Sequence, residues 1–178
     1  MFERDALLIG PPMRVKLLIV KYEIKDLEGN LLGQLVSQQK AVPHYFENNE
    51  GLRMSEVRVE GKMGLVTRIL IYDSLNQVRG VFEGGGSMTG ILGNKTRSPC
   101  TLRDKSGQVF CISDAYKYKS NLGSYEGAKK SGFLVRGSDG NVITSIHADS
   151  SSNAIQVDFL VPNLDRLAIM NFIAILVT

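Results

Sequence analysis

The last part of this sequence of 178 residues reads Leu164-Asp-Arg-Leu-Ala-Ile-Met-Asn-Phe-Ile-Ala-Ile-Leu-Val-Thr178. It follows Pro162 and Asn163, and because Asn is a preferred N-cap residue we expect Asn163 to start a helix here. Once Asp165 and Arg166 are passed, apolar residues occupy nearly every side of that helix. A helix that is hydrophobic all round has to be enclosed.

Two environments can enclose such a helix, a membrane and a protein core. Leu167 to Val177 extend about 17 Å, at roughly 1.5 Å per residue, whereas the apolar core of a bilayer is about 30 Å thick. We therefore predict a core helix wrapped by the rest of the chain, and no transmembrane segment. A strand remains the alternative for this segment, because it contains the β-branched residues Ile169, Ile173, Ile175 and Val177.

The rest of the chain alternates apolar and polar residues, which is the pattern of half-buried β-strands. The alternation is clearest in four runs: Lys21–Lys25, Glu56–Glu60, Tyr116–Lys119 and Ile155–Phe159. Between such runs a unit recurs, in which a strand is followed by acidic or small polar residues, then Gly or Asn, then another strand. Gly and Asn readily adopt the positive φ of tight turns, which predicts four hairpins, at Gly29, Asn76, Gly107 and Gly140.

Counting all such runs gives about a dozen short strands, too many for one flat sheet with exposed edges. A barrel or a sandwich removes or covers those edges. We predict a mainly β fold, a closed antiparallel barrel of roughly twelve strands that is built from hairpins and encloses the hydrophobic C-terminal helix. With 43% hydrophobic and 22% charged residues the composition is that of an ordinary globular protein, and we expect one domain over residues 1–178.

Two cysteines and no charged-then-apolar leader favour a reducing, cytoplasmic location, either free or peripheral to a membrane. Cys100 and Cys111 flank the hairpin around Gly107. A two-residue turn would make them face each other, whereas a three-residue turn with Gly107 left-handed, which we favour, would point them to opposite faces. We expect both to be reduced packing residues.

Common catalytic and metal-binding patterns are missing from the sequence. His44 and His147 have no spacing that would pair two metal ligands or a nucleophile with its base, and no Gly-x-Ser-x-Gly elbow occurs. In the glycine-rich run from Glu83 to Thr96, Asn94 interrupts the Gly-Lys-Thr pattern of a phosphate loop, so we expect a mobile loop or a barrel corner. We expect that the protein is not an enzyme and that it binds no cofactor and no metal. A small hydrolase is the least favoured alternative.

Basic residues are concentrated in one part of the sequence. From Lys95 to Arg136 there are nine Lys or Arg against three Asp or Glu, a net charge of +6, whereas the remainder of the chain carries −3. Such an asymmetry is compatible with an anionic partner such as a lipid headgroup or nucleic acid, and a solvated face is the alternative.

Three stretches of the chain resemble the phospholipid scramblases and the LURP-one-related proteins. Tyr22-Glu-Ile-Lys-Asp-Leu-Glu-Gly-Asn-Leu31 is similar to their early hairpin, and Thr67–Asp73 with its following hairpin is similar in layout. Asn153–Met170 resembles their last strand, short Leu-Asp link and apolar terminal helix. The resemblance implies the tubby C-terminal-like fold, a closed barrel of about twelve strands around a hydrophobic C-terminal helix.

The same resemblance implies a function at membranes. Tubby proteins hold phosphoinositide headgroups with Lys and Arg, and the basic stretch offers four candidate headgroup-binding residues: Lys117, Lys119, Lys129 and Lys130. We predict a non-enzymatic binding module that binds anionic phospholipid headgroups weakly, with no nucleic acid as partner. The alternative is a soluble protein-interaction or structural barrel with no lipid role.

Scramblases also carry an acidic calcium segment just before the terminal helix. Here Asp149 would open that segment, but Ala154 and Leu160 stand where an EF-hand loop has Gly and Glu. We therefore expect a surface turn at this place, with calcium affinity no tighter than about millimolar.

Overall fold

The computed structural model describes residues 1–38, 41–62, 65–83, 100–113, 132–149 and 154–177. These residues form thirteen strands and one helix: β1 (Ala6–Ile9), β2 (Met13–Lys16), β3 (Ile19–Lys25), β4 (Leu31–Gln38), β5 (Ala41–Asn48), β6 (Arg53–Lys62), β7 (Leu65–Asp73), β8 (Val78–Glu83), β9 (Cys100–Arg103), β10 (Val109–Ser113), β11 (Phe133–Gly137), β12 (Val142–Asp149), β13 (Ala154–Phe159) and α2 (Arg166–Val177). Three of the predicted runs lie in strands β3, β6 and β13, and the fourth, Tyr116–Lys119, lies outside the described residues.

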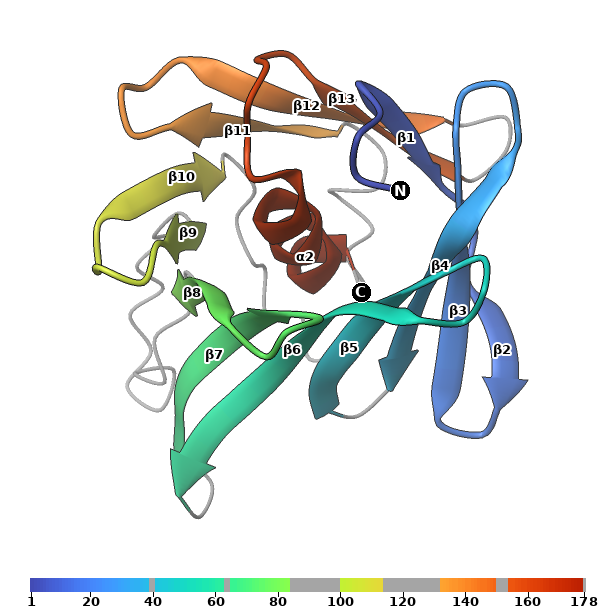
Figure 1. Ribbon diagram of the computed structural model, residues 1–178, viewed down its shortest axis with the longest axis horizontal. Helices are drawn as coiled ribbons and strands as arrows, with labels where there is room; N and C mark the ends of the chain where they lie inside the picture. The colour runs from blue at the N-terminus through green and yellow to red at the C-terminus, as the bar shows by residue number, and fades with distance from the viewer. Residues whose placement is uncertain (39–40, 63–64, 84–99, 114–131, 150–153, 178) are drawn as a thin grey trace, which may run out of the picture.

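The strands form a closed barrel around the helix (Figure 1). From β2 to β13 each strand pairs antiparallel with the next one in the chain, and β13 pairs with β1. The short strand β1 then closes the ring against β3, where Ile9 lies opposite Ile24. Twelve strands therefore make the barrel, as predicted, and β2 lies outside the ring on the same edge of β3 that β1 uses further along.

Five of the hairpins use the same turn, because five short sequences place Gly or Asn at its fourth position. In each turn the fourth residue has a φ between 61° and 88° and its N–H donates to the carbonyl of the first residue. The left-handed residue lets a three-residue loop follow the twist of the strands. Four of these residues confirm the predicted hairpins, and the fifth, at Gly51, was not predicted: Gly29, Gly51, Asn76, Gly107 and Gly140.

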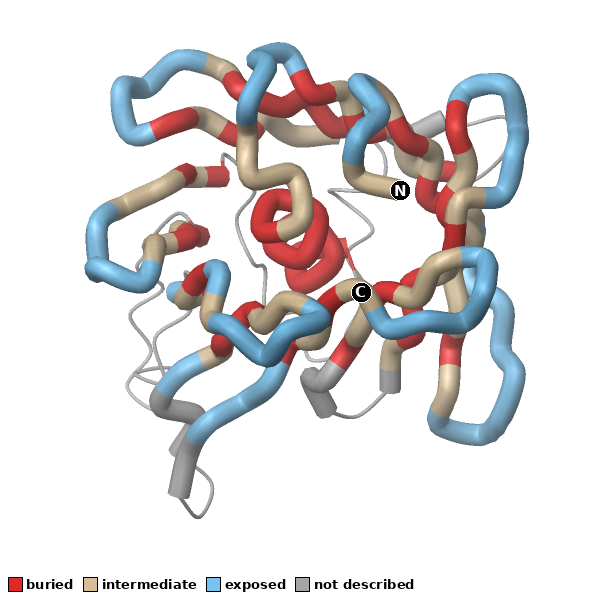
Figure 2. The backbone as a smooth tube through the Cα atoms, in the orientation of Figure 1, coloured by how far each residue is buried: buried red, intermediate tan, exposed pale blue. Residues whose placement is uncertain are grey.

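The buried residues lie on the helix and on the strands around it (Figure 2). Each barrel strand contributes at least one buried side chain, for example Val57 of β6 opposite Ile71 of β7. The helix α2 is buried over ten consecutive residues, 168–177, and lies closest to β5, β6, β7 and β8. The ring of Phe172 stands 5.7 Å from that of Phe82 on β8. The predicted enclosed helix is confirmed, and the alternative of a terminal strand is excluded.

The start of α2 differs from the prediction. Asn163 has a φ of 61°, whereas an N-cap residue needs an extended backbone, so Asn163 does not cap the helix. Asp165 does, because its Oδ1 accepts the N–H of Ala168 at 3.1 Å and its carbonyl accepts the N–H of Ile169 at 3.0 Å. Among the described residues, no helix has the length and apolar character needed to cross a membrane.

The cysteines also correct a prediction. The three-residue turn with Gly107 left-handed is confirmed, but the two side chains do not point to opposite faces. The pairing of β9 and β10 shifts register between Val109 and Cys111, so that Cys111 lies opposite Leu102 and both Cys100 and Cys111 are buried in the core. A β-bulge adds one residue to one strand and thereby changes which face its later residues occupy. Their role as packing residues is confirmed.

Candidate functional site

The four lysines predicted to bind lipid headgroups lie in the segment 114–131, outside the described residues: Lys117, Lys119, Lys129 and Lys130. Arg103 of β9 belongs to the same basic stretch, residues 95–136, and has a structural role. Arg103 donates from Nε to Glu83 Oε2 at 2.8 Å and from Nη1 to the Gly107 carbonyl at 2.9 Å. The glycine-rich segment 84–96 also lies outside the described residues.

The inside of the barrel carries a small polar cluster against α2. The side-chain amide of Asn171 donates to Ser55 Oγ on β6 and to the Leu167 carbonyl, both at 2.8 Å. His44 on β5 hydrogen-bonds to the Asn171 backbone, and within the described residues its Nε2 has no hydrogen-bond partner. Burial lowers the pKa of His44 to about 4. The imidazole is therefore neutral and remote from solvent, which makes it part of the core.

The mouth of the barrel holds the first turn of α2 by charge. Asp165 Oδ2 accepts from Arg79 Nη2 at 2.6 Å and from Arg79 Nε at 3.0 Å. Arg166, the next residue, binds the segment before β1: it donates to Asp5 Oδ1 at 2.7 Å and to the Arg4 carbonyl at 2.6 Å. These pairs join the helix to β8 and to the segment before β1, so these arginines serve the fold.

A serine, a histidine and an aspartate meet on the outer face of β12 and β13. His147 Nε2 lies 3.1 Å from Ser145 Oγ and 3.5 Å from Asp158 Oδ2. In a catalytic triad one ring nitrogen faces the serine and the other faces the carboxylate. Here a single nitrogen faces both, so the cluster lacks triad geometry and does not favour the hydrolase alternative.

The predicted surface turn at the position of the scramblase calcium segment is described only in part, because residues 150–153 lie outside the described residues. The chain runs in β12 to Asp149 and in β13 from the buried Ala154, and these two residues pair with each other. Within the ranges that the structure describes, no cluster of three or more His, Cys, Asp or Glu has the arrangement of a metal site.

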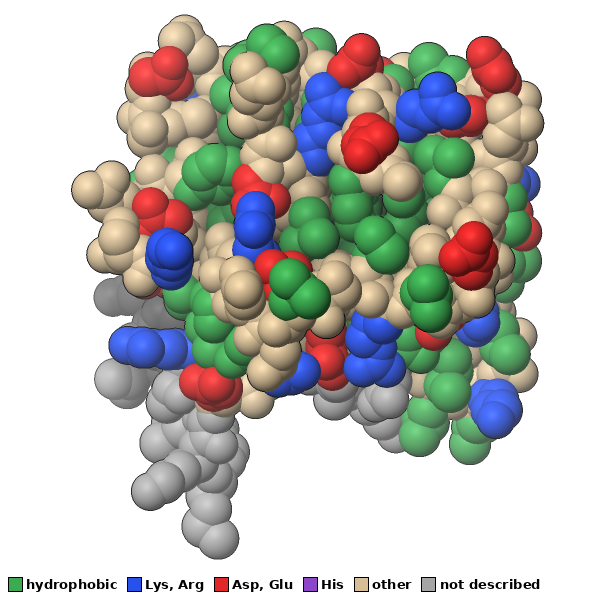
Figure 3. Space-filling view, in the orientation of Figure 1, with side chains coloured by type: hydrophobic (Ala, Val, Ile, Leu, Met, Phe, Trp, Pro, Cys, Tyr) green, Lys and Arg blue, Asp and Glu red, His purple; other side chains and the backbone are tan. Residues whose placement is uncertain are grey.

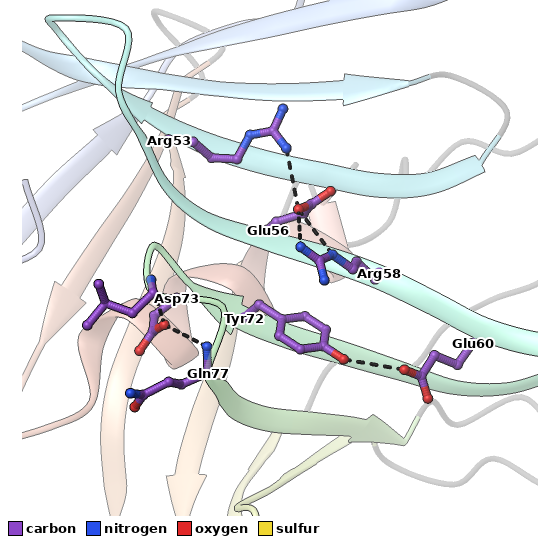
Figure 4. Close-up of polar contacts among 8 residues, drawn as sticks. Arg53, Glu56, Arg58, Glu60, Tyr72, Asp73 and Gln77 are labelled. Atoms are coloured by element: carbon purple, nitrogen blue, oxygen red, sulfur yellow. Dashed lines mark hydrogen bonds and ion pairs between the residues drawn. The ribbon is translucent and has the colours of Figure 1, made fainter.

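The outer face of β5, β6 and β7 carries arginines that are already matched (Figure 4). Glu56 Oε2 accepts from Arg58 Nη2 at 2.9 Å and lies 3.3 Å from Arg53 Nη1. The same guanidinium groups stack over aromatic rings, Arg53 at 4.0 Å from the Tyr45 centroid and Arg58 at 4.4 Å from that of Tyr72. An anion would have to compete with Glu56 for both arginines, so this face is a poor anion site.

A second basic surface lies on the hairpin of β2 and β3, residues 13–21, which sequence patterns did not single out. Met13 pairs with Lys21, and Lys16 pairs with Ile19. Because residues directly opposite each other share a face, as do residues two apart on one strand, Lys16 and Lys21 lie on the same face. Since Val20 is buried, that face is the outer one. In the described chain neither ammonium has a carboxylate partner.

The fold defines the class of protein: a closed antiparallel barrel of twelve strands that encloses a C-terminal helix. No family model and no curated protein matches the sequence. Among solved structures, the chain is similar to the X-ray structure of a protein from Arabidopsis thaliana, AT5G01750. The TM-score is 0.57 at 12% sequence identity, and the match covers 96% of this chain and 89% of the other.

At this low identity the likeness shows the fold alone. The barrel that the family resemblance implied is confirmed. Membership of the scramblase and LURP-one-related group stays a prediction.

Proposed function

We propose that the protein is a non-enzymatic binding module that binds anionic phospholipid headgroups weakly at a membrane surface. The observation that carries the proposal is an excess of basic over acidic residues. In the described chain Lys16 and Lys21 have no carboxylate partner, and over residues 95–136 the sequence carries a net charge of +6. We assign the headgroup contacts of that stretch to Lys117, Lys119, Lys129 and Lys130.

The filled barrel supports a site on the outside. Because α2 occupies the interior with buried apolar side chains, a polar headgroup finds its partners on the outer surface. The geometry of the His147 cluster and the burial of His44 support a binding role over catalysis.

The binding is expected to be weak and sensitive to salt. Each Lys or Arg near an anionic membrane contributes about 1 kcal/mol, and this attraction falls off within a Debye length of about 8 Å at physiological ionic strength. Four lysines therefore supply only a few kcal/mol.

Sedimentation with liposomes tests the proposal. Phosphatidylcholine vesicles with increasing phosphatidylserine content are mixed with the wild type at low and at high salt. We expect binding that rises with phosphatidylserine and falls with salt. Substitution of all four lysines by Ala should weaken it, and substitution of the same four by Arg, which keeps the charge, should preserve it.

Two results would count against the proposal. If the wild type does not sediment with anionic vesicles at low salt, the lipid function is wrong and the protein-interaction alternative is favoured. If the four-Ala variant binds as well as the wild type, the assignment to these four lysines is wrong.

A further inference from the structure

The hairpin of β2 and β3 exposes an unusual amount of apolar surface. Met13, Val15, Leu17 and Leu18 are exposed by 41%, 53%, 80% and 48%, and all eight residues from 11 to 18 are exposed (Figure 2). Elsewhere in the described chain, exposed large apolar side chains stand singly or in pairs, as is normal for a protein surface. Four of them within six residues, at a turn and its edge strand, mark a contact surface.

This apolar tip is surrounded by positive charge. Residues 6–22 contain Arg14, Lys16 and Lys21 and no Asp or Glu. Leu17 and Leu18 form the turn itself, so Lys16 directly precedes the tip and Lys21 stands three residues behind it. Figure 3 shows hydrophobic and basic side chains together in the region that the hairpin occupies at the lower right of Figure 1.

The position of the hairpin allows a flat partner to reach it. Because β2 lies outside the twelve-stranded ring and pairs only with β3 among the described strands, its tip is not covered by a neighbouring strand. Exposed edge strands in proteins are usually protected by charge or by a covering segment. Here Lys16 and Lys21 supply the charge, but the tip between them consists of Leu17 and Leu18.

We infer that this hairpin inserts Leu17 and Leu18 into the interface of an anionic membrane, with Lys16 and Lys21 at the level of the phosphates. The inference rests on the proposed function and adds a second contact, which depends on apolar burial as well as on charge. A lysine keeps its ammonium in water while its stem lies along apolar surface, so both lysines can stay at the headgroups while the tip enters the acyl region. Charge complementarity favours a bilayer with anionic lipids over a neutral one.

The chain contains no tryptophan, which permits a direct measurement of insertion. A Leu17→Trp variant carries a single tryptophan, at the tip. A Leu75→Trp variant is the matched control, because Leu75 is 76% exposed in the turn between β7 and β8. Both are mixed with phosphatidylcholine vesicles containing phosphatidylserine, with and without brominated acyl chains. We expect a blue shift and quenching by bromine for Leu17→Trp and neither for Leu75→Trp.

A second pair of variants measures the contribution to affinity. The double substitution Leu17→Glu with Leu18→Glu should lower partitioning into these vesicles about tenfold or more, since it removes the buried apolar area and adds repulsion. Its thermal unfolding should match that of the wild type, because the tip is exposed. Leu75→Glu should change neither quantity.

The outcomes separate the inference from the proposed function. Sedimentation of the Leu17→Trp protein with anionic vesicles, without a blue shift or quenching, would overturn insertion and leave headgroup binding intact. Failure of the wild type to sediment would overturn both. A blue shift that grows with protein concentration in the absence of vesicles would identify a second copy of the chain as the partner and overturn insertion.

Discussion

Removal of α2 should abolish the folded state. A chain truncated after Asn163 lacks the seven large apolar side chains that the helix buries: Ile169, Met170, Phe172, Ile173, Ile175, Leu176 and Val177. At about 1.5–3 kcal/mol each, these side chains contribute roughly 10–20 kcal/mol. The net stability of a typical domain is about 5–15 kcal/mol. The truncated chain is therefore expected to show no cooperative thermal transition by circular dichroism.

Single substitutions measure how much individual side chains contribute to the stability that the helix provides. Phe172→Ala leaves a cavity beside Phe82 and should lower the free energy of unfolding by about 3–5 kcal/mol. Leu160→Ala, directly after β13, removes an exposed side chain and should change the free energy of unfolding by less than about 0.5 kcal/mol. Urea unfolding followed by circular dichroism measures both. A truncated chain that stays monomeric and melts cooperatively would show that the barrel does not need its helix.

Three further predictions concern the polar groups that hold the helix. Because burial lowers the pKa of His44 from 6.5 to about 4, protonation favours the unfolded chain, and stability present above pH 6.5 is lost as the pH falls towards 4. Between pH 7 and pH 5 the loss is about 2 kcal/mol, and urea titrations of His44→Leu should lack it. Asn171→Ala leaves the Ser55 hydroxyl buried without its partner and should lower the free energy of unfolding by about 1–3 kcal/mol in urea. Asp165→Ala removes both the N-cap and the ion pair with Arg79, and it should lower the free energy of unfolding, followed by thermal melting, by at least about 1 kcal/mol. Asp165→Asn should keep the cap and lose only the ion pair.

Each of these predictions has a contrary result. An unchanged pH dependence in His44→Leu would mean that another group carries it. A Ser55→Ala, Asn171→Ala double variant whose loss equals the sum of the two single losses would mean that the pair is not coupled. Equal melting of the Asp165→Ala and wild-type proteins would remove the capping role.

The hairpins and the helix were predictable because their signals are local. A turn that places Gly or Asn at a left-handed position depends on four or five residues, and the sequence around Gly107 contains all of them. The turn at Gly51 follows the same rule, since Asn48 Oδ1 accepts the N–H of Glu50 and of Leu52, and its sequence carries the same local signal. The helix was predictable because, of the ten consecutive residues 168–177, all but Asn171 are apolar, so no face of the helix suits solvent.

Features that depend on pairing between strands were not predictable. The face that Cys111 occupies depends on a register shift at Val109, which no local pattern reveals. The exposed tip was hidden for a related reason. Leu17 and Leu18 precede Ile19 and Val20, and such an apolar run reads as a buried strand until the position of the turn is known.

The seam between β1 and β13 sets the order in which the chain can finish folding. Leu7 pairs with Val157, 150 positions later, whereas the hairpins pair residues only a few positions apart. Hairpins form within microseconds, but contacts so distant in sequence make folding slow. Before β13 and α2 join the barrel, the inward apolar face of the preceding strands has nothing to pack against. β1 therefore gains its partner β13 only through a contact 150 positions away in the sequence, and aggregation before that contact forms is the hazard of this fold.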